Sequence, residues 1–181
     1  MIAARVALLS GLLLAACSHP PAPAPATPAG TPSANEWRFA TRGDVSSLTI
    51  ADDKVSFCDE AGLHQLDART GRVLAASAVC PAAPPAATGT PEVTVRTPDL
   101  GPDDIVEIAG EATSFPIEGH ARDWASDAGK VVIVGTGSEV LELLPAAGKR
   151  LRLSESGASR VAVGGGWAAW WDGAAVVAHR L

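Results

Sequence analysis

The sequence predicts an all-β fold made of short antiparallel sheets. Short apolar runs alternate with Gly, Pro and Asp throughout residues 36–181, and no stretch there keeps a helical period over several turns. The strand–turn–strand pattern of residues 53–74 also returns at 129–153, with one added residue. These observations are typical of a β-sandwich, a β-barrel or a propeller.

We expect a single domain over residues 36–181, with a flexible Pro-rich loop at 81–91. Its strands should begin and end where turn-forming residues bound each apolar run. The expected strands are 46–50, 54–58, 63–66, 72–76, 92–97, 104–109, 113–116, 121–125, 130–134, 139–144, 149–153, 159–163, 167–171 and 174–180.

The first residues have the features of a secretory signal. Arg5 precedes an apolar run of about a dozen residues, which is too short for a lasting transmembrane anchor. A resemblance to the lipobox of bacterial lipoproteins lies in Leu14, Ala15, Ala16 and Cys17. It implies a signal peptide at residues 1–16 and acylation of Cys17, which would anchor the mature chain in a lipid bilayer. The alternative is an ordinary signal peptide that happens to end near a cysteine.

Residues 17–35 form the expected tether between the lipidated cysteine and the folded domain. From Ser18 onward the tether is rich in Pro and Ala and has no bulky apolar side chain, so it cannot offset the entropy of ordering. When extended, such a segment reaches roughly 50 Å. By resemblance to the sorting of Gram-negative lipoproteins, Ser18 in place of Asp implies the outer membrane and its periplasmic face.

Net charge and cysteine count limit the partners and the chemistry. The formal net charge is −6, and an acidic chain is a poor candidate for binding nucleic acid. Beyond Cys17 the chain has Cys58 and Cys80, and a disulfide between them would contribute about 3 kcal/mol. The alternative is two separate thiols, because residues two strands apart in one sheet lie about 10 Å from each other. Pairing requires Cys80 to fold back after its strand ends.

The repeat becomes clear when the two segments are aligned. Aligned pairs are Lys54 with Lys130, Val55 with Val131, Phe57 with Ile133, Leu66 with Leu143, Gly71 with Gly148 and Arg72 with Lys149. A weaker third copy begins near Gly165. In the first copy Asp67 can accept hydrogen bonds from nearby backbone N–H groups, while Gly71 can adopt a positive φ without strain.

The turn of the first copy resembles the propeller repeat of pyrroloquinoline-quinone-type proteins. The matching residues are Leu66, Asp67, Ala68, Thr70, Gly71, Arg72, Val73 and Leu74. The resemblance implies propeller-like repeats, about three to four incomplete blades at roughly 40–45 residues each. Ala75 stands where the family has Trp, and Leu144 and Ala147 replace Asp and Thr in the second copy. Three arrangements stay open, namely an open fragment, a protomer completed by a partner, and a sheet stack that reuses the hairpin.

The sequence contains no recognised motif for catalysis, phosphate binding or metal binding. His64, His120 and His179 each lie alone on or beside an expected strand, and Asp103 with Asp104 should cap a turn. The chain is also too short for the complete propeller in which a quinone-dependent dehydrogenase encloses its cofactor and calcium. We therefore expect no enzymatic activity, no catalytic residue, no metal site and no cofactor.

Trp167, Trp170 and Trp171 form the most conspicuous side-chain cluster of the sequence. In an extended strand Trp167 and Trp171 point to one face and Trp170 to the other. One interpretation is a platform for a protein or glycan partner, because Trp carries much of the binding energy at interfaces. The other is core packing between neighbouring sheets.

Together these inferences predict a lipid-anchored envelope lipoprotein facing the periplasm. It would be a non-catalytic β-repeat module that binds or scaffolds a protein partner, as the resemblance to non-enzymatic lipoprotein propellers implies. The alternative is a small envelope inhibitor or immunity-type lipoprotein that blocks a secreted hydrolase.

Overall fold

The computed structural model describes residues 35–81, 92–99, 101–155 and 157–181. Its strands are β1 (Glu36–Ala40), β2 (Ser47–Ala51), β3 (Lys54–Asp59), β4 (Gly62–Asp67), β5 (Val73–Ser77), β6 (Val93–Arg96), β7 (Asp104–Ile108), β8 (Ser114–Ile117), β9 (Asp123–Asp127), β10 (Lys130–Val134), β11 (Val140–Leu144), β12 (Lys149–Ser154), β13 (Arg160–Gly164), β14 (Trp167–Trp171) and β15 (Ala175–Arg180). A short 3-10 helix, η1, covers Pro145–Ala147.

Every strand expected from the sequence is present, as β2 to β15, with ends that differ by a residue or two. The expected signal peptide at 1–16, the lipidation site Cys17 and nearly all of the tether at 17–35 lie outside the described residues. So does the Pro-rich loop at 81–91, apart from Pro81.

A search of the described residues finds no helix with the length and apolar character needed to cross a membrane.

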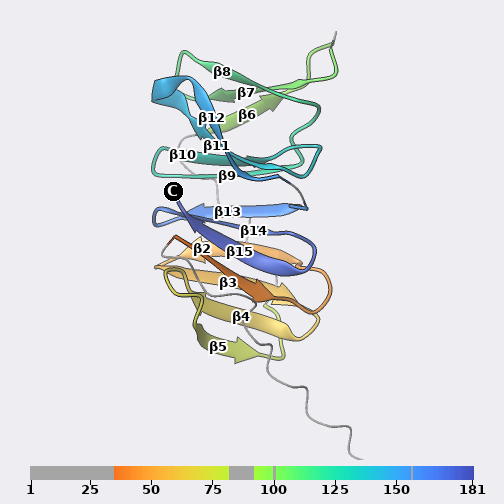
Figure 1. The fold of residues 1–181 in the computed structure, drawn as a ribbon, viewed down its shortest axis with the longest axis vertical. Helices are drawn as coiled ribbons and strands as arrows, with labels where there is room; N and C mark the ends of the chain where they lie inside the picture. The colour runs from red at the N-terminus through yellow and green to blue at the C-terminus, as the bar shows by residue number, and fades with distance from the viewer. Residues whose placement is uncertain (1–34, 82–91, 100, 156) are drawn as a thin grey trace, which may run out of the picture.

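The strands form four short antiparallel sheets. Their strand orders are β2-β3-β4-β5, β6-β7-β8, β9-β10-β11-β12 and β1-β15-β14-β13. Figure 1 shows them stacked face to face, in the order β6 to β8, β9 to β12, β13 to β15 with β1, and β2 to β5. The fold is therefore all-β, and the described residues show a stack of sheets rather than a closed ring.

Three apolar layers hold the stack together, one between each pair of neighbouring sheets. Their members are alternate residues whose side chains point toward the facing sheet. Examples are Phe57, Leu66 and Val176 in the first layer, Val106, Ile117 and Leu143 in the second, and Val132, Val140 and Val177 in the third. Burying each such side chain contributes about 1.5–3 kcal/mol.

β10 shows why some strands lack the usual alternation of apolar and polar residues. Val131 and Ile133 pack toward the sheet of β6 to β8, whereas Val132 and Val134 pack toward β13 to β15. Because both faces of β10 are buried, its sequence is a continuous apolar run.

β1 is a strand that the sequence pattern did not predict. It pairs with β15, placing Trp37 opposite Ala178 and Phe39 opposite Val176, and both aromatic side chains are buried. The segment is short and its pairing partner lies at the other end of the chain. Its strand state therefore depends on a long-range contact that no local pattern reports.

The turn at Asp67–Gly71 confirms the expected turn chemistry. Asp67 Oδ1 accepts hydrogen bonds from the N–H groups of Arg69 and Thr70 and from the Thr70 hydroxyl. The hydroxyl bond is the main reason that the pKa of Asp67 lies below its usual value. Gly71 has a φ of 67°, and a Cβ there would lie 2.8 Å from the Trp37 ring. Glycine is thus required both by conformation and by close packing.

The second copy of the repeat ends in the same way, although its sequence has drifted. Its turn is η1, and Gly148, which aligns with Gly71, has a left-handed φ of 59°. The aligned residues Lys54 and Lys130 begin β3 and β10, the second strands of their sheets. The internal repeat predicted from the sequence is therefore a repeat of sheets.

Candidate binding surfaces

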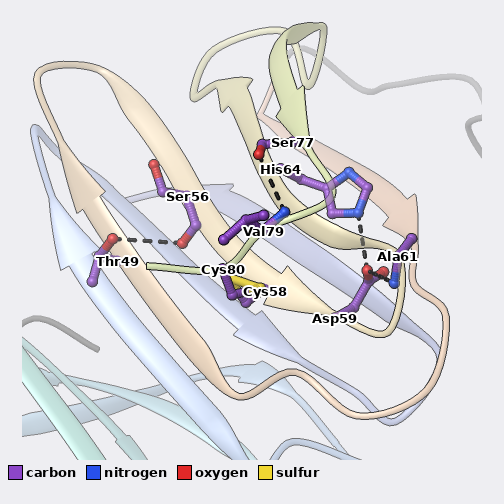
Figure 2. The surroundings of a disulfide bond; sticks show 9 residues. All are labelled: Thr49, Ser56, Cys58, Asp59, Ala61, His64, Ser77, Val79 and Cys80. Carbon is purple, nitrogen blue, oxygen red and sulfur yellow. Dashed lines mark hydrogen bonds and ion pairs between the residues drawn. A yellow bond between two sulfur atoms is a disulfide. The ribbon is translucent and has the colours of Figure 1, made fainter. Parts of the chain in front are cut away.

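The structure joins Cys58 and Cys80 in a disulfide whose Cα atoms are 5.9 Å apart. Cys58 lies in β3, two strands from β5, so the bond needs the chain to reverse after β5. Figure 2 shows this return, with Val79 and Cys80 lying over the sheet. The Ser77 hydroxyl accepts a hydrogen bond from Val79 N–H and stabilises the bend. The segment after β5 is thereby held on the outer face of the last sheet in the stack.

Of the two interpretations of the tryptophan cluster, core packing fits the burial of Trp167 and Trp170 and the binding platform does not. Trp167 and Trp170 retain only 6% and 2% of their exposed area. They point to opposite faces, with Trp167 in the layer beside β2 to β5 and Trp170 in the layer beside β9 to β12. Both are buried because the strand β14 lies between two covered faces. Trp171 is partly buried and lines a surface cleft.

Each of the three histidines of the described chain lies near a carboxylate. His64 Nε2 is 3.0 Å from Asp59 Oδ1, and its ring stacks on Phe57. His179 Nδ1 is 3.7 Å from a Glu36 carboxylate oxygen. Within the described part of the chain, these contacts pair each histidine with a carboxylate but add no hydroxyl or thiol nucleophile to the pair.

Asp104 gathers a small polar cluster at the junction of two sheets. Its Oδ1 accepts the Thr97 hydroxyl at 2.7 Å and lies 3.1 Å from His120 Nδ1, while Oδ2 accepts the Ala121 N–H. The Thr97 hydrogen bond is the largest influence that lowers the pKa of Asp104. Thr97 thus donates its hydroxyl hydrogen to the Asp104 carboxylate rather than to His120. The cluster fastens β7 to the segment that leads into β9.

Asp103 has a different partner from Asp104, and in the described residues both carboxylates bond to other segments instead of capping their own turn as expected. Asp103 Oδ1 accepts the N–H of Gly119 at 2.9 Å. The two neighbouring carboxylates therefore face separate donors and do not form a catalytic pair.

Within the described ranges, no group of three or more His, Cys, Asp or Glu side chains is arranged to hold a metal ion.

The outer edge strands of the four sheets differ in how they are protected against further strand pairing. β12 carries Lys149, Arg150 and Arg152. The edge strand β8 contains Pro116, and Arg150 donates a hydrogen bond to the carbonyl of that proline. β1 alternates charged with apolar side chains. β5, with the sequence VLAAS, has neither charge nor proline.

All five residues of β5 are exposed, and Val73 and Leu74 keep 48% and 43% of their area in solvent. β5 also ends its sheet, so one side of its backbone has no strand partner among the described residues. This strand, Val73–Ser77, is called the open edge below.

A second surface is a cleft of about 610 Å³ where three strands begin together. It is lined by Asp44, Val45, Ser46, Arg122, Ser159, Arg160 and Trp171. These residues precede or begin β2, β9 and β13, and end β14. We call this surface the arginine cleft. The sequence does not reveal this cleft, because its residues come from four separate segments.

Comparison with known proteins finds no matching family model and no matching curated protein. Among solved structures, the chain is similar to the computationally designed Ika4 protein, with a TM-score of 0.33, 13% identity and coverage of 77% of this chain and 92% of that chain. The designed Ika8 protein has a TM-score of 0.31 and 15% identity, and the match covers 75% of this chain and 45% of that chain. BamB from Moraxella catarrhalis has a TM-score of 0.20 and 13% identity, and the match covers 79% of this chain and 62% of that chain. At these TM-scores the likenesses carry no argument about fold or function.

Proposed function

We propose that this chain is a lipid-anchored, non-catalytic binding module that docks a protein partner in the cell envelope. The open edge carries the proposal. An unprotected strand edge can accept an extended segment of another protein, whose main-chain hydrogen bonds give affinity while alternate side chains give specificity. The exposed Val73 and Leu74 supply apolar area for that contact.

The four sheets are, in this proposal, successive units of a propeller-like arrangement of the pyrroloquinoline-quinone type. Two observations support it. The aligned segments fall on equivalent strands of two sheets, and the first strand of the chain completes the sheet that contains the last. The propeller-like order leaves the ends of the stack free, and the open edge belongs to one of these end sheets.

A charge placed on the open edge tests the docking proposal. We expect Leu74→Lys to reduce recovery of an envelope partner about tenfold relative to the unmodified chain, because a lysine on an edge strand opposes strand addition. Recovery is measured by cross-linking the full chain in membranes, followed by quantitative mass spectrometry. Amide hydrogen exchange of β5 in the purified complex should also slow, since added main-chain bonds protect those amides.

Leu151→Lys is the matched control. Leu151 is 49% exposed on β12, an edge that already carries three basic residues, so this variant should retain full recovery. Equal recovery with Leu74→Lys and with the unmodified chain would remove the open edge as the docking site. Capture only by an added peptidoglycan hydrolase, with no resident partner, would favour the inhibitor alternative.

The membrane anchor is tested at Cys17. Replacing Cys17 with Ser removes the atom that would be acylated, and two or three acyl chains at about 0.8 kcal/mol per buried methylene are what would hold the protein to lipid. We expect the variant to move from the membrane pellet to the soluble fraction on centrifugation. Retention in the pellet after a carbonate wash would contradict the lipobox interpretation. Cys58→Ser serves as the control that changes a cysteine without touching the anchor.

A further inference from the structure

We infer that the arginine cleft binds the free C-terminal carboxylate of a peptide. The inference is separate from docking at the open edge, since the two surfaces share no residue. The volume of about 610 Å³ falls within the range of about 300–1,000 Å³ that is usual for ligand sites.

The cleft is lined by two arginines, Arg122 and Arg160, for which the described residues supply no ion pair with a carboxylate. Arg122 donates a hydrogen bond to the Ser138 hydroxyl at 3.2 Å. The ion pairs of the described chain involve Arg38, Arg69 and Arg96, but neither Arg122 nor Arg160. Arg122 and Arg160 are both exposed, so the cleft presents two positive charges to solvent on a chain with a formal net charge of −6. Planar guanidinium groups match the two oxygens of a carboxylate.

Asp123 is an acidic group whose charge interacts with that of Arg160, and both of its oxygens already accept hydrogen bonds. Oδ1 accepts the Trp124 N–H and Oδ2 accepts the Val161 N–H, each at 3.0 Å. Burial raises the pKa of Asp123, although those bonds and the charge of Arg160 oppose the rise. Asp123 thus links β9 to β13 by a hydrogen bond. It leaves the Arg160 guanidinium available to bind another anion.

The remaining lining residues fit the groups next to a peptide carboxylate. Ser46 and Ser159 offer hydroxyl donors, and the Asp44 carboxylate can accept the N–H of the last peptide bond. Trp171 donates its Nε1–H to the Thr41 hydroxyl at 3.2 Å, which orients the ring as an apolar wall. A C-terminal residue presents a carboxylate, an N–H group and a side chain, and the cleft has a complement for each.

The opposing charge of Asp44 also argues against larger anions. A polyanion would meet Asp44 and a chain of net negative charge, whereas a single carboxylate engages only the arginine side of the cleft. The occupant is therefore a peptide end rather than a nucleic acid or an anionic membrane.

An acid–amide pair of short peptides provides the test. Acetyl-Ala-Ala with a free carboxylate and the same peptide with a C-terminal amide are titrated into the full chain in detergent, and NMR follows the Arg Nε–H signals and the Trp171 indole. We expect the acid to bind with a Kd of about 1 mM and the amide at least tenfold more weakly. The double variant Arg122→Gln, Arg160→Gln should bind the acid peptide at least tenfold more weakly than the unmodified chain does.

Arg96→Gln is the matched control, because Arg96 pairs with Glu107 on the far end sheet and should leave binding unchanged. Circular dichroism of each variant separates loss of binding from loss of folding. The inference fails if acid and amide bind equally, if neither shifts the signals up to about 20 mM, or if inorganic phosphate at equal ionic strength binds as tightly as the acid. Each of these outcomes leaves docking at the open edge unaffected, and loss of binding at the open edge would likewise leave this result standing.

Discussion

Replacing Trp170 with alanine is expected to lower the free energy of unfolding by about 4 kcal/mol. Trp170 is 2% exposed and packs with Val132, Val140 and Val177 between two of the four sheets. Removal of the indole leaves a cavity in a layer that both sheets share, and the surrounding strands cannot collapse into it without losing their register. Urea denaturation of the full chain, followed by circular dichroism, measures the change.

Trp124→Ala is the control for Trp170→Ala. Trp124 is 42% exposed on β9, so its loss should cost no more than about 1 kcal/mol. Similar effects of the two substitutions would mean that Trp170 is not enclosed between the sheets. In that case the interpretation of the tryptophan cluster as a binding platform would return for this residue.

Removal of the disulfide by the double change Cys58→Ser, Cys80→Ser is expected to lower stability by about 3 kcal/mol, mainly by freeing the loop in the unfolded chain. The two cysteines are 22 residues apart in sequence. In the folded state the change also releases the segment around Val79 from the outer face of β2 to β5. Urea denaturation under non-reducing conditions measures the loss.

Reduction of the unmodified chain should give the same loss, whereas the double variant should not respond to reductant. Peptide mapping without reduction should recover Cys58 joined to Cys80. Two alkylatable thiols in protein taken from the envelope would contradict the bond, and so would a double variant as stable as the parent.

The strands were predictable because the turn residues that end them are recognisable from the local sequence. In the turn after β4, Asp67 and Gly71 each have a role that only a few residue types can fill, and similar turns bound most other strands. The opposite orientation of Trp167 and Trp170 also followed from the two-residue period of a strand. What lay on each face of β14 did not follow, because the layers that cover it come from distant segments.

The arginine cleft could not be predicted for a similar reason. Arg122 and Arg160 both precede or begin strands that look ordinary in sequence, and only the stacking of β9 beside β13 brings them together. The open edge is an intermediate case. The absence of charge in β5 is visible in the sequence, but its significance depends on β5 being the outermost strand of its sheet.

The pairing of β1 with β15 determines when this chain can finish folding. Trp37 and Phe39 contact Ala68 and Phe57 earlier in the chain, but the backbone of β1 finds its strand partner only among the last residues. The first strand therefore stays unpaired until the whole chain is available. Such long-range closure slows folding relative to local hairpins and prolongs exposure to aggregation. A chain truncated before β15 would leave β1 without the strand it pairs with. A deletion at the C-terminus would therefore destabilise the first strand of the fold.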